Sequence, residues 1–112
     1  MKEISDEFMM QMISQAKSFS VALLRASDNY GTPESQPLVW EHARRNFALR
    51  AEGVLVVVCP ISDETELKGI GIFNAAVDQT RLIMEGDPAV KAGIFTFEVH
   101  SARSFSGDCL PK

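Results

Sequence analysis

Two side chains of this sequence, His42 and Asp87, have the chemical types that are needed to move a proton at neutral pH. Histidine exchanges a proton near pH 7, so His42 is the first candidate for a general base. A carboxylate such as Asp87 is the usual acceptor that holds the second ring nitrogen of such a base. The alternative for His42, in the middle of a predicted helix, is a partly buried ring that is satisfied by a backbone carbonyl. The sequence alone leaves both interpretations open.

The stretch around Asp87 also has a purely structural interpretation. In this stretch Asp87 is a preferred N-cap residue, Pro88 suits the first helical position and Gly93 suits the end of a short helical turn. Asp87 would then only accept hydrogen bonds from backbone N–H groups. The two roles are compatible, because a carboxylate has two oxygens and about four acceptor sites.

Two further residues are weaker candidates for contact with a ligand. Arg25 shares a strand face with the apolar side chains of its strand, where a guanidinium needs a carboxylate partner. That partner is either Glu98 or an anionic group of a ligand. Tyr30 lies in a loop rich in Gly, Pro and Ser, where its ring either overhangs a pocket or packs on the protein surface.

Three other kinds of site are not supported by the residue spacing. Glu98 and His100 share a strand face, but no spacing of His, Cys, Asp and Glu fits a zinc site, so we predict no metal and no cofactor. Gly69 and Gly71 lie within a strand and precede no helix start, which predicts close packing and not a phosphate loop. Cys59 ends an apolar run, and its expected burial disfavours the thiolate that a nucleophile needs.

Size and charge exclude several classes of protein. The 112 residues fit one domain that is large enough to bury a core. The net charge is −4 and Lys and Arg form no cluster beyond short pairs, which argues against a nucleic-acid or membrane-surface partner. No apolar run approaches the length of a membrane span, and no signal-peptide pattern is present, so we expect a cytoplasmic protein.

The apolar periodicity predicts three helices and four strands. The helices are expected over 5–17, 38–53 and 76–86, and the strands over 18–27, 54–61, 68–75 and 94–102. After the leading helix the order is βαββαβ, the split βαβ plan of a ferredoxin-like α+β fold with a four-stranded antiparallel sheet. This divides the chain into an N-terminal helical extension, a ferredoxin-like domain and a tail, at 1–17, 18–101 and 102–112.

The same pattern predicts apolar surfaces that two helices cannot cover. The strand over 54–61 is apolar throughout, so both of its faces should be buried. A second copy of the sheet, packed face to face, would cover the open face, which predicts a homodimer. The helix over 38–53 is also apolar on two sides, with Trp40 and Phe47 on one and His42 on the other. One side should meet the sheet, and the other the N-terminal helix or the partner chain.

Most of the chain, roughly residues 18–100, resembles the YCII-related domain family. The resemblance is carried by the stretches "EHARRNFALRAEGVLVVVCPISDE", "GIGIFNA" and "MEGDPAVKAGIFTFEVH". It implies a ferredoxin-like fold that forms a dimeric α+β barrel, in a superfamily with muconolactone isomerases and small monooxygenases without cofactors. It also implies a histidine–aspartate pair in a cleft, and the matching positions of this sequence are His42 and Asp87.

Two hypotheses about function follow. In the first, the protein is an enzyme in which His42 is general acid and base on a small anionic or cyclic metabolite, without a cofactor. Asp87 would hold its tautomer, and Arg25 or Tyr30 would contact the ligand. The reaction would be of the isomerase, lyase or hydrolase type. In the second hypothesis the protein is a non-catalytic dimeric module that binds a small molecule or serves a structural role.

Overall fold

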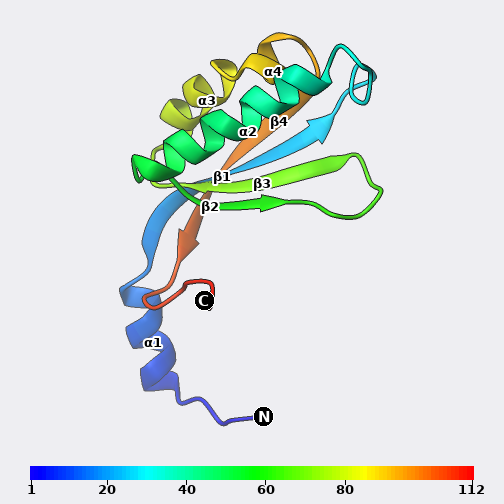
Figure 1. Ribbon diagram of the computed structural model, residues 1–112. Helices are drawn as coiled ribbons and strands as arrows, with labels where there is room; N and C mark the ends of the chain where they lie inside the picture. Colours follow the sequence, from blue (N-terminus) through cyan, green and yellow to red (C-terminus); the bar gives the residue numbers. More distant parts are fainter.

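The computed structural model describes all residues 1–112 as a four-stranded antiparallel sheet with three helices over one of its faces (Figure 1). The elements are α1 Asp6–Ser14, β1 Lys17–Ala26, α2 Gln36–Ala51, β2 Leu55–Pro60, β3 Leu67–Phe73, α3 Val77–Glu85, α4 Pro88–Lys91 and β4 Phe95–Ser104. The strand order is β2-β3-β1-β4. This confirms the predicted ferredoxin-like α+β fold, with the short helix α4 inserted before the last strand.

The alternation of side chains along β1 decides which face of the sheet the helices cover. Ser20, Ala22 and Leu24 are buried, whereas the residues between them are only half-buried. Their neighbours in β3 are Gly71, opposite Ala22, and Gly69, opposite Leu24. Because paired residues of an antiparallel sheet point to the same side, both glycines lie on the covered face.

The hydrophobic core lies between this face and the helices. Its buried residues are Ala22, Leu24, Leu55, Phe73, Met84, Ala89, Ile94, Phe95 and Val99. The hydroxyl groups of Ser20 and Thr80, both fully buried, lie 2.6 Å apart and join β1 to α3 by a hydrogen bond. This bond satisfies two polar groups that would otherwise destabilise the core.

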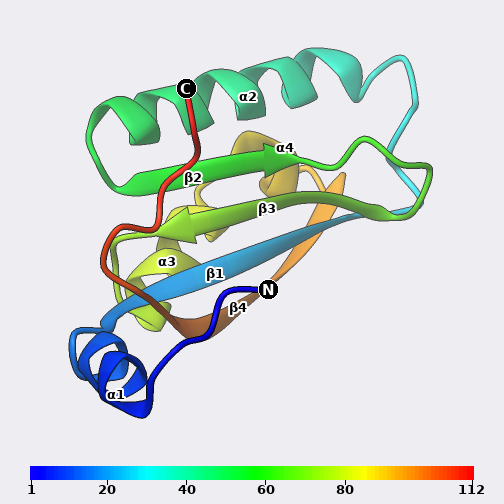
Figure 2. The same cartoon turned by 90° about the horizontal axis from the view of Figure 1, so that it is seen from below.

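The opposite face of the sheet has no helix over it, as the view in Figure 2 shows. Half-buried apolar side chains cover much of this face across three strands. They are Phe19, Val21, Leu23, Val57, Cys59, Ile70 and Ile72. The structure therefore contains the open apolar face for which the sequence predicts a partner sheet, and the homodimer itself stays a prediction.

Helix α1 does not cover α2, so of the two alternatives for the second side of α2 the N-terminal helix is excluded and the partner chain stays a prediction. No residue of α1 is buried, and the helix projects from the end of β1 away from the other helices (Figure 1). The link between α1 and β1 is Gln15 and Ala16, which is too short to return α1 over the helix layer. As a result Trp40 and Phe47 of α2 are 68% and 65% exposed.

Strand β4 extends further than the sequence pattern predicts. Its pairing with β1 continues to Lys17 opposite Ser104, past residue 102, where we expected the tail to begin. The pairing is made by backbone groups and does not need the apolar alternation that was used to place the strand end. None of the helices of the structure is long and apolar enough to cross a membrane.

Candidate active site

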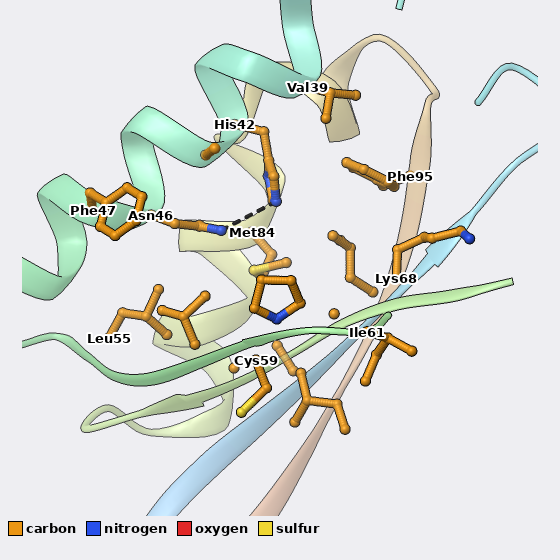
Figure 3. A pocket seen from close by; sticks show the side chains of 18 of the residues that line it. Val39, His42, Asn46, Phe47, Leu55, Cys59, Ile61, Lys68, Met84 and Phe95 are labelled. Carbon is orange, nitrogen blue, oxygen red and sulfur yellow. Dashed lines mark hydrogen bonds between the residues drawn. The ribbon is translucent and has the colours of Figure 1, made fainter. Parts of the chain in front are cut away.

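A cavity of about 310 Å³ lies between α2 and the covered face of the sheet (Figure 3). Most of its lining is apolar, and the polar side chains in it are those of Tyr30, His42, Asn46 and Lys68. Ligand sites in proteins are typically apolar pockets of this size or larger with a few polar groups that orient the ligand. The cavity is therefore the candidate active site, and it suits a small molecule.

Two glycines of β3 form part of the cavity floor. A side chain at Gly69 would find its nearest neighbour atoms at 3.8 Å, including Leu24, which is an ordinary contact. A side chain at Gly71 would come within 3.1 Å of the side chains of Leu55 and Phe73. Close packing, predicted for both glycines, is thus found at Gly71, whereas at Gly69 a side chain would meet only ordinary van der Waals contacts.

His42 and Asp87 are in contact at the wall of the cavity. His42 comes from the middle of α2 and Asp87 from the turn between α3 and α4, and the Nδ1 atom of the ring is 2.6 Å from Oδ2 of the carboxylate. Their side chains are 12% and 2% exposed. An ionised Asp87 can only accept, so Nδ1 carries the hydrogen and the neutral ring has its lone pair on Nε2.

Asp87 is also the N-cap of α4. Its other oxygen, Oδ1, accepts the backbone N–H groups of Ala89 at 2.9 Å and Val90 at 3.2 Å. The helix that it caps ends at Lys91 with Ala92 as its C-cap, and Gly93 follows with a φ of 74°, in the left-handed region. The structure thus combines the two roles considered for Asp87, with one oxygen for the cap and one for the histidine.

The electrostatics of Asp87 keep it ionised. Burial on its own raises the pKa of Asp87, but the hydrogen bond and charge of His42, together with the N–H groups of Val90 and Ala89, outweigh the burial and hold the pKa below its ordinary value. A carboxylate with a lowered pKa is charged at neutral pH, which is the state that the tautomer of His42 requires.

The other ring nitrogen of His42 faces the cavity. Its Nε2 atom lies 3.2 Å from Nδ2 of Asn46, the contact drawn as a dashed line in Figure 3. Because Nε2 is the acceptor of this tautomer, the Asn46 amide is the donor. The ring of Phe95 packs against the imidazole with 5.1 Å between the ring centres. Sequence reasoning missed Asn46, although its position one helical turn after His42 is a signal that could have found it.

Tyr30 lies at the rim of the cavity. Its ring centre is 5.6 Å from that of Phe95, and Nζ of Lys68 lies 5.2 Å from the Tyr30 ring. The loop that carries Tyr30 is held in place by the side-chain amide of Asn29, which donates to the Gly93 carbonyl at 3.2 Å. The rim therefore presents an aromatic ring and a cation.

Arg25 lies away from the cavity, on the uncovered face of the sheet. It forms an ion pair with Glu98, which also accepts a hydrogen bond from Nε2 of His100 at 2.8 Å. The hydrogen bonds from His100 and Arg25 hold the pKa of Glu98 below its ordinary value. Of the two partners considered for Arg25, the structure shows the internal carboxylate, and Arg25 is not brought together with the other candidates.

The two cysteines are free thiols and do not complete the site. Cys59 is half-buried on β2, where its partner in β3 is Ile70 of the uncovered face, and Cys109 is exposed near the C-terminus. No three side chains of His, Cys, Asp or Glu lie together as ligands of a metal ion would. The polar side chains of the cavity wall are therefore His42, which Asp87 contacts from behind, and Asn46, with Tyr30 and Lys68 at the rim.

Comparison with known proteins yields a likeness in fold. No family model matches the sequence, and no curated protein matches it. Among solved structures the chain is similar to 5-chloro-2-hydroxyhydroquinone dehydrochlorinase (TftG) from Burkholderia phenoliruptrix AC1100, in complex with 2,5-dihydroxybenzoquinone. The TM-score is 0.52 at 18% identity, and the match covers 73% of this chain and 90% of that chain. At this identity the likeness shows a shared fold.

Proposed function

We propose that the protein is an enzyme that transfers a proton on a small cyclic or anionic metabolite, with His42 as general acid and base. The observation that carries the proposal is the contact of 2.6 Å between His42 Nδ1 and Asp87 Oδ2. It fixes the ring so that Nε2 is the basic atom on the wall of the cavity. A base placed in this way typically accelerates a reaction by roughly 10²–10⁴-fold.

The lining of the cavity supports a flat, small ligand with a polar edge. Apolar side chains and Phe95 suit a ring, and the volume of about 310 Å³ limits its size. Tyr30 is in position to pack on such a ligand, whereas Arg25 is not. Lys68 forms no ion pair and lies at the rim, so its charge favours an anionic group there.

The fold likeness supports membership of the YCII-related domain family within the dimeric α+β barrel superfamily, which we propose on the motifs and the fold together. TftG, the similar structure, is a dehydrochlorinase and binds a dihydroxybenzoquinone. Removal of a proton from a hydroxylated ring is chemistry that a histidine–aspartate pair supports. We therefore favour an isomerase or lyase reaction over hydrolysis, and a cytoplasmic location stays a prediction.

The alternative is a binding module without catalysis. It is favoured by the capping bonds of Asp87 and by the amide of Asn46, which occupies the lone pair of Nε2 in this structure. In that case His42 and Asp87 hold α2 to the turn before α4, and the cavity only stores or senses its ligand.

One experiment separates the two functions. We expect the protein to catalyse the exchange of the α-protons of cyclohexanone in D₂O, followed by proton NMR, and to bind 2,5-dihydroxybenzoquinone, followed by saturation transfer. The His42→Gln variant should lose the exchange and keep the binding, because only the base is removed. The matched control is Glu41→Gln, on the exposed side of the same helix, which should retain both. Binding without exchange in the wild-type protein would favour the binding module.

We also propose that two chains pack their uncovered sheet faces together. The half-buried apolar side chains of that face would then leave water, as in other face-to-face sheet packings. Light scattering at micromolar concentration should give twice the chain mass of 12.4 kDa. Val21→Glu, at the centre of this face, should shift the protein to the monomer, and a wild-type mass of one chain would contradict the proposal.

A further inference from the structure

We infer that Asn46 is a catalytic residue that donates a hydrogen bond to the substrate oxygen on which negative charge develops as His42 removes a proton. The inference rests on the proposed function and adds the residue that stabilises the intermediate. It also specifies the substrate class as a small cyclic carbonyl compound with an acidic C–H next to the carbonyl, or its enol.

The placement of Asn46 carries the inference. It follows His42 by one turn of α2, and both side chains line the cavity, where the amide nitrogen lies beside the imidazole (Figure 3). The amide group has two N–H donors. One is directed to Nε2 at 3.2 Å, and the side chain has no other hydrogen-bond partner in the protein. A ligand C–H that reaches Nε2 takes the place of the first N–H at the lone pair, and the amide then has its N–H donors free for the ligand oxygen beside it.

The chemistry of proton removal requires such a donor. When His42 Nε2 takes the proton, the C–H bond breaks, an N–H bond forms, and the electron pair moves through the carbonyl group to its oxygen. The carbon that loses the proton is bonded to the carbonyl carbon, and the carbonyl carbon carries that oxygen. Because His42 and Asn46 are adjacent, Nε2 can contact the carbon that loses the proton while the Asn46 amide contacts the oxygen. Return of the proton to another atom of the enolate completes an isomerisation, with no oxidant or reductant.

Of the polar side chains that line the cavity, Asn46 is the one in hydrogen-bond contact with His42 Nε2. The rest of the lining near His42 is apolar, so an oxyanion would lack stabilisation there. Lys68 lines the cavity, but its amine points away from His42 (Figure 3). The amine lies 5.2 Å from the centre of the Tyr30 ring. The stabilisation of negative charge that develops beside Nε2 thus depends on Asn46. In these apolar surroundings the N–H dipole of Asn46 stabilises such a charge more than it would in water.

The test compares two readouts in Asn46→Ala. The first is the exchange of the cyclohexanone α-protons in D₂O, and the second is the affinity for para-nitrophenolate, a stable anion that resembles an enolate and is followed by its absorbance. We expect kcat for exchange to fall by roughly 10²-fold, the usual effect of removing one oxyanion donor. The affinity for the phenolate should fall by about tenfold, a typical effect for a hydrogen bond to a charged group.

Two further variants control for damage to α2. Glu41→Ala changes the exposed side of the same helix and should leave both readouts unchanged. Asn46→Gln keeps the amide and should recover part of the exchange. If Asn46→Ala exchanges protons and binds the phenolate as the wild type does, the inference is overturned. If the wild type shows no exchange but the phenolate affinity still depends on Asn46, the proposed proton transfer fails while the donor role stands.

Discussion

Replacement of Asp87 by asparagine should slow proton transfer by orders of magnitude and leave the fold intact. The amide oxygen of asparagine can still accept the N–H groups of Ala89 and Val90, so the cap of α4 persists. Its NH₂ group must then face His42 Nδ1, where it can only donate. The ring is forced into the tautomer with its hydrogen on Nε2, and the basic lone pair leaves the cavity. We expect the rate of exchange to fall by roughly 10²–10⁴-fold.

Two measurements check this prediction. Nitrogen-15 NMR of the His42 ring reads the tautomer directly, and we expect the protonated nitrogen to change from Nδ1 to Nε2 in Asp87→Asn. Thermal unfolding should change little. An unprotonated Nε2 in the variant, or exchange at the wild-type rate, would show that Asp87 does not set the tautomer.

Replacement of Asp87 by alanine should instead damage the fold. The carboxylate is 2% exposed and accepts from three N–H groups, those of His42, Ala89 and Val90. Alanine leaves all three without an acceptor in a buried place. A buried donor that is left without its acceptor typically costs about 1–3 kcal/mol, so the loss of several acceptor contacts adds to several kcal/mol. This is a large share of the roughly 5–15 kcal/mol that stabilises a typical protein.

Denaturant unfolding of the wild type, Asp87→Ala and Asp87→Asn measures this cost. The alanine variant should be the least stable of the three, and equal stability of the two variants would show that the capping bonds contribute little. The effect should also depend on pH. Because the folded pKa of Asp87 lies below the ordinary value of about 3.9, its stabilisation is complete above that value and is lost as the pH falls through the folded pKa. The gap between wild type and Asp87→Ala should narrow below about pH 4.

Much of the fold could be predicted from the sequence because its signals are local. Apolar alternation, helical periodicity and turn residues gave the four strands, the core helices and their order. The capping role of Asp87 was also predictable, since the N-cap, Pro88 and Gly93 lie within one short stretch. The course of α1 could not be predicted, because it depends on the short link to β1. The end of β4 could not be predicted either, because it depends on backbone pairing with the distant strand β1.

In the candidate site, too, some features follow from local sequence and others only from the tertiary structure. The sequence by itself determined that His42 and Asp87 have the chemistry of a proton-transfer pair, because residue type decides which groups exchange protons. Only the tertiary structure decided that they touch across 45 positions of sequence, that Arg25 lies on the other face and that Asn46 stands beside Nε2. Those outcomes depend on how α2 packs over the sheet, and packing between elements that are distant in sequence leaves no local pattern.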